Sequence, residues 1–134
     1  MKHSSLLSRE MTVCYFVNRL RDEVLLATKK RGYGKGLLNG YGGKKEGEES
    51  GFECALRESE TECGLTLTEA DAKKIAEITF INDNDEVFCE IFVIESWQGD
   101  PHESEEMGSP EWYSISQLPF EDMMDGDDKW VPQI

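Results

Sequence analysis

The chain has 134 residues, 28 of them acidic and 14 basic, and a formal net charge of −14 at pH 7. This length fits one domain with a single packed core. The negative charge argues against a nucleic acid polymer as partner, because Lys and Arg supply most of the non-specific affinity for phosphate backbones. No signal peptide or long apolar run is present, so we expect no membrane partner and a cytoplasmic location.

The numbers of cysteines and histidines and the distribution of charge along the chain indicate which kinds of binding site to expect. The four cysteines form no C-x-x-C pair and are expected to be reduced core residues, and two histidines are too few for a histidine-based transition-metal site. Residues 1–45 carry a net charge of +7, whereas residues 46–134 carry −21. A short cationic rim beside an acidic region suits a small metal-bound polyphosphate.

Strand patterns occur on both sides of one predicted helix. In chain order, β-rich or alternating runs cover residues 12–17, 23–28, 75–81, 86–94 and 111–115, and Gly-rich segments at 31–36 and 39–43 flank a short piece at 37–38. The run Asn82-Asp83-Asn84-Asp85 predicts the turn of a hairpin. A partial helical turn is expected at 70–74, and Ser116 is expected to cap a turn that leads to residue 124. This order predicts an α/β domain with a mixed sheet.

The central helix is expected from about Gly51 to Cys63. Ser50 and Glu53 have the spacing of a capping box, and Gly64 is well placed to end the helix. Residues at three- and four-residue steps form a mostly apolar stripe that would pack on a sheet. This stripe consists of Phe52, Ala55, Leu56, Ser59 and Cys63.

Two glutamates of this helix, Glu58 and Glu62, lie off the apolar stripe. Four residues apart, they place two like charges on one face, which costs the isolated helix a few tenths of a kcal/mol. A hard cation reverses that sign, because Mg²⁺ prefers carboxylate, phosphate and water oxygens. The alternative is a solvated acidic face, which we prefer for Glu48, Glu53 and Glu60.

Six residues around this helix stand at fixed spacing: Gly43, Glu49, Arg57, Glu58, Glu62 and Gly64. This arrangement resembles the Nudix box, the signature of hydrolases that cleave a nucleoside diphosphate linked to another moiety X. Thr61 stands where the family usually has a further Glu. Gly47 comes one place early, so that Glu48 and Glu49 are both candidates for the first glutamate of the box, and the spacing to Arg57 favours Glu49.

The flanking segments KKRGYGKGLLNGYGGK and ESEEMGSPEWYSISQLPFEDMMDGDDKWVP narrow the resemblance. They are similar to the branch of Nudix enzymes that hydrolyses oxidised purine nucleoside triphosphates such as 8-oxo-dGTP. The resemblance implies an α/β/α sandwich, one domain over residues 1–134 with a flexible segment at 1–10, and Mg²⁺ dependence with Mn²⁺ as a possible substitute. It also implies attack of water on phosphorus, yielding a nucleoside monophosphate and pyrophosphate.

The resemblance assigns roles to individual residues. The metal ligands would be the Gly42 carbonyl, Glu58, Glu62 and Glu106, and Glu106 would assist either the metal or the attacking water. Arg57 would orient the glutamates and, with Glu49, Glu58 and Glu106, form the catalytic set. Tyr33, Asn39, Met124 and Asp127 would line the purine pocket, with Lys29 and Lys44 near the phosphates. In this branch tryptophans stand at the positions of Leu38 and Met124, and an acid stands at that of Gly126.

Two other readings remain open. The same chemistry could act on a different X, such as ADP-ribose, a dinucleoside polyphosphate or a cap-like nucleotide. Because Thr61 removes one carboxylate, a weakly active nucleotide-binding module is a third reading. The expected partner is a small nucleotide, and the chain is a monomer or homodimer. The sequence ends at Ile134, before a C-terminal strand that many relatives carry, so a sheet edge is expected to be open or covered by a partner subunit.

Overall fold

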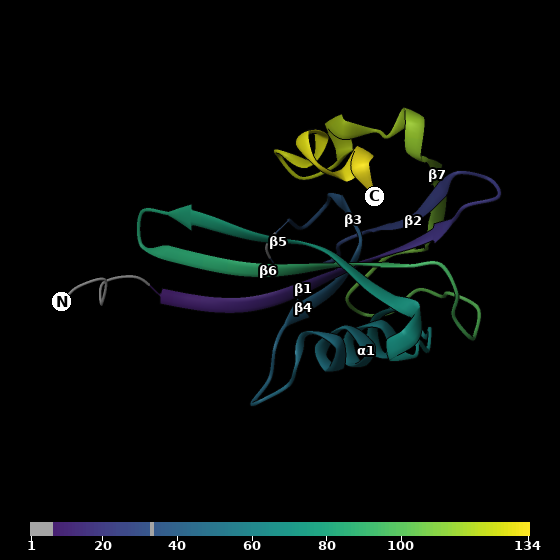
Figure 1. The fold of residues 1–134 in the computed structure, drawn as a ribbon. Coiled ribbons are helices and arrows are strands. Elements are labelled where there is room, and N and C mark those ends of the chain that lie inside the picture. The colour runs from purple at the N-terminus through teal and green to yellow at the C-terminus, as the bar shows by residue number, and fades with distance from the viewer. Residues whose placement is uncertain (1–6, 33) are drawn as a thin grey trace.

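The computed structural model describes residues 7–32 and 34–134, and its centre is a mixed seven-stranded sheet (Figure 1). The strands are β1 (Leu7–Asn18), β2 (Glu23–Thr28), β3 (Leu38–Asn39), β4 (Tyr41–Lys44), β5 (Ala72–Asn82), β6 (Asp85–Ile94) and β7 (Glu111–Ser114). The main path runs β3-β2-β1-β6-β5, with β4 also paired to β1 and β7 to β2. The pair β1 and β6 is parallel and the other pairs are antiparallel. The predicted mixed sheet is confirmed.

Strand β1 is the central element because three strands pair with it. β4 lies along one edge of its middle part, where Thr12 is opposite Gly43 and Val13 is opposite Gly42. β6 lies along the other edge, and β2 takes over as antiparallel neighbour only at the end of β1, at Val17. This arrangement fixes the two adjacent glycines of β4 against the middle of the sheet.

Helix α1 (Gly51–Glu62), the one α-helix among the described residues, begins at the predicted capping box. The Ser50 hydroxyl accepts a hydrogen bond from the Glu53 N–H at 3.1 Å, and the Glu53 carboxylate accepts one from the Ser50 N–H at 2.8 Å. The helix ends with Gly64 in the left-handed region, at φ +78°, where its N–H donates to the Ser59 carbonyl at 3.0 Å. The sequence therefore predicted both ends of this helix to within one residue.

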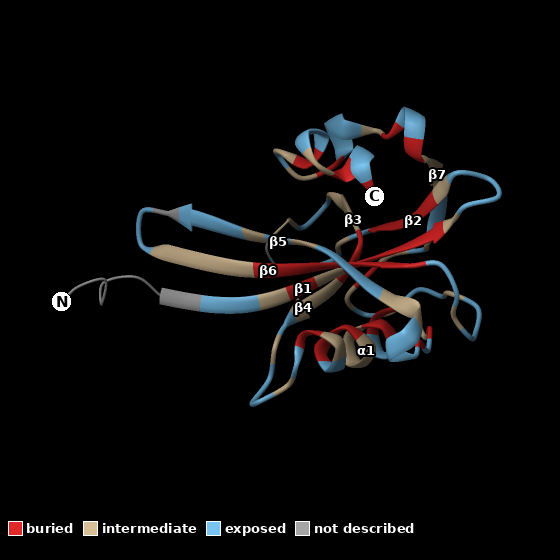
Figure 2. Ribbon diagram, viewed as in Figure 1, coloured by how far each residue is buried: buried red, intermediate tan, exposed pale blue. Residues whose placement is uncertain are grey.

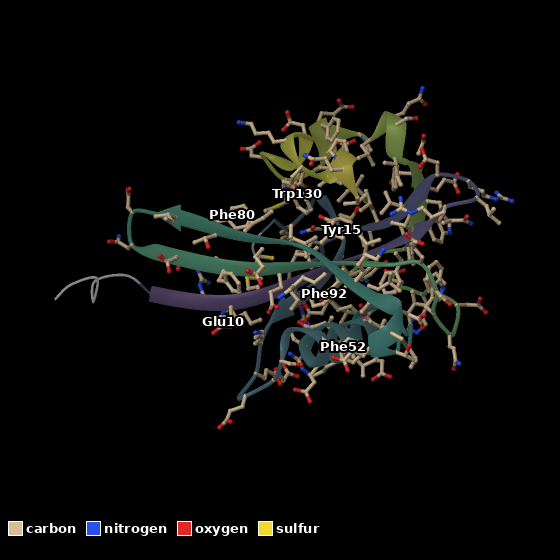
Figure 3. All side chains as sticks on the ribbon, in the orientation of Figure 1. Glu10, Tyr15, Phe52, Phe80, Phe92 and Trp130 are labelled. Atoms are coloured by element: carbon tan, nitrogen blue, oxygen red, sulfur yellow. The ribbon has the colours of Figure 1, made fainter. Side chains whose placement is uncertain are left out.

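Two hydrophobic clusters lie on opposite faces of the sheet. Figure 2 shows buried segments in the central strands, in α1 and in the C-terminal turns. The cluster under α1 includes Phe16, Ala55 and Phe92. The cluster on the other face includes Tyr15, which meets Trp130 edge to face with ring centroids 5.5 Å apart. Figure 3 shows Phe92 below the sheet, and Tyr15 and Trp130 above it. The period-two alternation of β1 accordingly buries side chains on both faces.

Short 3₁₀ helices make up the layer opposite α1 (Figure 1). They are η2 (Ile115–Gln117), η3 (Phe120–Asp122), η4 (Asp127–Lys129) and η5 (Val131–Gln133). The implied sandwich thus has one α-helix on one face and 3₁₀ turns on the other, among the residues that the structure describes. The turn expected after Ser116 begins at Ile115, with Ser114 at the cap position and no side-chain cap bond.

Three expected boundaries differ in the structure. Residues 7–10, expected to be part of a flexible segment, belong to β1, because β6 pairs with them from Leu7 onward; residues 1–6 lie outside the described part. The helical turn expected at 70–74 is the 3₁₀ helix η1 (Glu69–Asp71), and β5 starts directly after it. The hairpin turn is tighter than expected, because Asn82 and Asp85 still pair.

Two further expectations concern an edge of the sheet and the state of the cysteines. Among the described strands β5 pairs with β6 alone, so it forms one edge of the sheet. The four cysteines are free and buried, as expected. No helix in residues 7–32 or 34–134 is long and apolar enough to cross a membrane.

Candidate active site

Helix α1 presents two glutamates to the adjacent glycines of β4. Glu62 is buried, and its Oε1 accepts a hydrogen bond from the Gly42 N–H at 2.9 Å. The carboxylate of Glu58 occupies the space that a Cβ on Gly43 would fill, and a Cβ on Gly42 would overlap the Thr12 carbonyl. A side chain at position 42 would therefore collide with the backbone of the neighbouring strand, and one at position 43 would displace the Glu58 carboxylate.

The surroundings of Glu58 and Glu62 disfavour the ionised form of both carboxyl groups. Burial raises the pKa of Glu62 to about 7, and the charges of Glu58 and Glu106 push it in the same direction, against the Gly42 N–H and Lys29, which lower it. Burial is also the main cause that raises the pKa of Glu58, again with a contribution from Glu106. A site that raises the pKa of neighbouring carboxylates is suited to a cation.

Arg57 connects the loop before α1 to Glu58. Its Nε donates to Glu49 Oε2 at 2.7 Å and its Nη2 to Glu49 Oε1 at 3.0 Å. The guanidinium also donates to the Lys44 carbonyl at 3.0 Å and to Glu58 Oε1 at 3.3 Å. The hydrogen bonds from Arg57 are the largest cause that lowers the pKa of Glu49 to about 2. Glu48 is exposed, so the structure brings Glu49 to Arg57, as the spacing favoured.

Glu106 lies on the loop before β7. Its charge contributes to the raised pKa of both Glu58 and Glu62, yet its own carboxylate accepts a hydrogen bond from Arg31 Nη2 at 2.7 Å. That bond is the largest cause that lowers the pKa of Glu106. The sequence indicated a basic run at Arg31 but gave no partner for it.

The oxygen donors of this site match the preferences of the expected metal ion only in part. In the part of the chain that the structure describes, no three His, Cys, Asp or Glu side chains are gathered as a metal-binding group, and Glu106 is paired with Arg31. Glu58 and Glu62 nevertheless offer oxygen donors alone, beside a backbone that leaves space for their carboxylates. These features fit a hard divalent cation such as Mg²⁺.

The residues predicted to line the purine pocket form a second group, on β3 and in the C-terminal turns. An isolated bridge between Leu38 and Met123 joins β3 to the C-terminal turns. The Asn39 Oδ1 accepts from the Gly40 N–H at 2.9 Å. Asp127, at the start of η4, is buried; among the described residues its Oδ2 has no hydrogen-bond partner, and burial raises its pKa to about 6.

The remaining predicted residues border these two groups. Met124 packs its sulfur against Gly34, and Tyr33 lies outside the described residues. Lys29 is close enough to Glu62 to lower the pKa of that carboxyl. Lys44 is exposed at the end of β4.

The fold and this site define an α/β enzyme with a carboxylate centre on a capped helix. Residues 8–134 match the family model of the NUDIX domain. The chain therefore belongs to the Nudix family, and it is a hydrolase of phosphoric anhydride bonds, as the box predicted. Members of this family generally use a divalent metal ion and act on small nucleotides.

Two relatives and one solved structure illustrate the similarity. The chain is 38% identical over 109 residues to the oxidized purine nucleoside triphosphate hydrolase of Danio rerio, and 37% identical over 109 residues to that of Mus musculus. Each match covers 81% of this chain and 69% of the relative. The crystal structure of the MutT NUDIX hydrolase from Burkholderia pseudomallei superimposes with a TM-score of 0.83 at 20% identity, covering 96% of this chain and 98% of the other. This likeness confirms the fold.

Proposed function

We propose that this Nudix hydrolase is a Mg²⁺-dependent pyrophosphohydrolase. Its leading substrate is an oxidised purine nucleoside triphosphate such as 8-oxo-dGTP, and the products are the nucleoside monophosphate and pyrophosphate. The observation that carries the chemistry is the pair formed by the half-buried Glu58 and the buried Glu62, which lie against Gly43 and Gly42. The names of the two relatives support the choice of base.

The residues divide into a reacting centre and its support. Glu58, Glu62, the Gly42 carbonyl and Glu106 would hold the ion. When bound, Mg²⁺ would neutralise polyphosphate charge and lower the pKa of a water molecule. Arg57, fixed by Glu49, orients Glu58.

We expect the following proton transfer and bond changes at phosphorus. A carboxylate of the centre, Glu58, Glu62 or Glu106, accepts the proton of the attacking water. The new bond forms between that water oxygen and phosphorus, and the bond from phosphorus to the bridging oxygen of pyrophosphate breaks. Lys29 and Lys44 place positive charge near the phosphates.

Base recognition is assigned to Asn39 and Asp127. The buried Oδ2 of Asp127 has no partner in the described residues, and a buried polar atom without a partner is costly. A purine edge would supply that partner. With its pKa raised to about 6, this carboxyl changes between acceptor and donor near neutral pH, which suits the altered donor and acceptor pattern of an oxidised purine.

The test is a pyrophosphate-release screen over a nucleotide panel, with and without Mg²⁺. We expect the highest specificity constant for 8-oxo-dGTP, no turnover in chelator, and a preference over dGTP that Asp127→Ala erodes by about 1–3 kcal/mol. Equal specificity constants for dGTP and 8-oxo-dGTP in the wild type would refute the base preference. Faster turnover of ADP-ribose or a dinucleoside polyphosphate would change the assignment of X. Binding without turnover of any nucleotide would indicate a binding module.

A further inference from the structure

Two segments distant in sequence run side by side next to the acidic centre. The Lys30 N–H donates to the Glu106 carbonyl at 2.8 Å, and the Gly108 N–H donates to the Thr28 carbonyl at 2.8 Å. An antiparallel bridge between Lys29 and Met107 lies between these bonds. The backbone therefore fixes residues 28–31 against residues 106–108, independently of their side chains.

This register brings Arg31 to Glu106, with Nη2 and Oε1 2.7 Å apart. The Arg31 side chain is 59% exposed, and exposed ion pairs contribute little to folding stability. Backbone hydrogen bonds already hold the two segments together, so this ion pair is not needed to join them. The ion pair instead determines where the Glu106 carboxylate lies.

Arg31 binds Glu106 in this structure, and Lys29 adds a weaker attraction. The negative charge of Glu106 acts on Glu58 and Glu62, so a cation bound between those two would attract it. Arg31 attracts it outward, to the rim. In this structure Arg31 holds the Glu106 carboxylate, and the described residues contain no group of three His, Cys, Asp or Glu side chains gathered to hold a metal ion.

Arg31 has a stronger potential partner than a carboxylate. A guanidinium binds phosphate oxygens in a bidentate manner, and a polyphosphate carries several negative charges.

The next residue, Gly32, has φ +82°, a conformation that glycine adopts freely. The loop that follows reaches the base side of the site, where Gly34 contacts Met124. Along the chain, Arg31 thus follows Lys29, whose charge acts on Glu62, and precedes Gly34, which contacts Met124.

We propose that Arg31 is a positioning residue that restrains Glu106 in the free enzyme, and that the polyphosphate of the substrate takes over its guanidinium and releases Glu106 to the Glu58 and Glu62 centre. The inference rests on the proposed function, since it takes Glu106 as a member of that centre. It makes metal binding and polyphosphate binding mutually dependent, with Arg31 as the link.

The test compares Arg31→Gln with Lys30→Gln. Lys30 is the matched control, because it lies on the same segment, loses the same charge, and pairs with Glu103 at 2.5 Å rather than with Glu106. Mn²⁺ is the probe, and its binding to each protein without nucleotide is followed by the electron paramagnetic resonance of the free ion. We expect Arg31→Gln to bind Mn²⁺ roughly fivefold more tightly than wild type, a typical coupling between two sites, and Lys30→Gln to stay within about twofold.

Two additional measurements separate a positioning role from other roles. In a Glu106→Gln background, Arg31→Gln should no longer tighten Mn²⁺ binding, because the restrained charge is gone. The KM for the best nucleotide should rise in Arg31→Gln, and thermal unfolding should match that of wild type. Unchanged Mn²⁺ affinity with a raised KM would overturn the proposal and leave Arg31 as a phosphate ligand. Tightening that persists without Glu106 would also overturn it, as a general charge effect.

The same experiment shows which hypothesis fails. A wild-type protein that binds Mn²⁺ and hydrolyses nucleotide, but responds equally to Arg31→Gln and Lys30→Gln, refutes this inference alone. A wild-type protein that binds no Mn²⁺ and hydrolyses no nucleotide refutes the proposed function, and the inference with it.

Discussion

Arg57 binds Glu49 through two hydrogen bonds, Nε to Oε2 at 2.7 Å and Nη2 to Oε1 at 3.0 Å. The two residues lie on either side of the helix cap at Ser50, so the pair joins the loop before α1 to the helical turn that carries Glu58. The Arg57 guanidinium thereby connects the acidic centre to this loop, which is also held by hydrogen bonds between Glu46 and Glu49.

The first prediction concerns this pair. Glu49→Gln keeps the shape of the side chain but removes the charge that Arg57 binds, so Arg57 should no longer hold Glu58 in one position. We expect turnover to fall about ten- to hundredfold, the scale for small misplacements in a catalytic site, with a smaller change in KM. Steady-state kinetics of Glu49→Gln and of the exposed control Glu48→Gln check this. Equal losses in the two variants would contradict the assignment of Glu49.

A second prediction concerns Glu62, which is buried beside Gly42. Glu62→Gln should lower Mg²⁺-dependent turnover by at least about two orders of magnitude, because an amide keeps the shape but loses the charge that would hold Mg²⁺. The fold should persist, as checked by circular dichroism in chelator. Near-normal turnover at saturating Mg²⁺ would remove Glu62 from the proposed metal ligands.

Stability should depend on pH through Asp127. Burial raises the pKa of this carboxyl from 3.8 to about 6 on folding, so the folded state binds more protons than the unfolded state between these values. Stability is therefore lost as the pH rises through this window, by at most about 3 kcal/mol. Asp127→Asn should remove that loss.

Urea unfolding at pH 5 and pH 8 measures the effect. The variant should gain stability relative to wild type between the two pH values, whereas the exposed control Asp125→Asn should follow wild type. Parallel changes in Asp127→Asn and wild type would mean that the carboxyl is solvated.

The fourth prediction uses the exposed Thr61, which precedes Glu62 and follows Glu58 by three residues. Thr61→Glu adds a charge to a helix face that already repels itself. It should therefore lower the melting temperature slightly in chelator, tighten Mg²⁺ binding and raise turnover at limiting Mg²⁺. Mg²⁺ titrations of wild type, Thr61→Glu and the uncharged control Thr61→Gln test this. Superimposable curves would mean that Thr61 points away from the metal.

Fold prediction from the sequence succeeded where local signals are strong. The capping box at Ser50 and the glycine at position 64 marked both ends of α1, and alternation marked β5 and β6. The sequence did not predict β4 as a strand, because Tyr41-Gly42-Gly43-Lys44 has little strand propensity. Its pairing depends on β1 and on the close approach that only glycine permits.

Site prediction had a similar limit. The pair Glu49 and Arg57 followed from spacing along one helix and its preceding loop, because eight residues separate them. The pair Arg31 and Glu106 did not, because 75 residues separate them and only the backbone register between two loops brings them together. The unpartnered oxygen of Asp127 also depends on tertiary burial, which no local pattern encodes.

The four buried cysteines can be used to measure local unfolding of the protein. Cys14 lies on β1, Cys54 within α1, Cys63 at the end of α1 and Cys89 on β6, and burial raises the pKa of both Cys63 and Cys89 to about 12. A thiol reagent needs an exposed thiolate, so each sulfur should react only while its element is detached. The alkylation rate at each cysteine therefore measures how often that part of the molecule comes apart, without any added label.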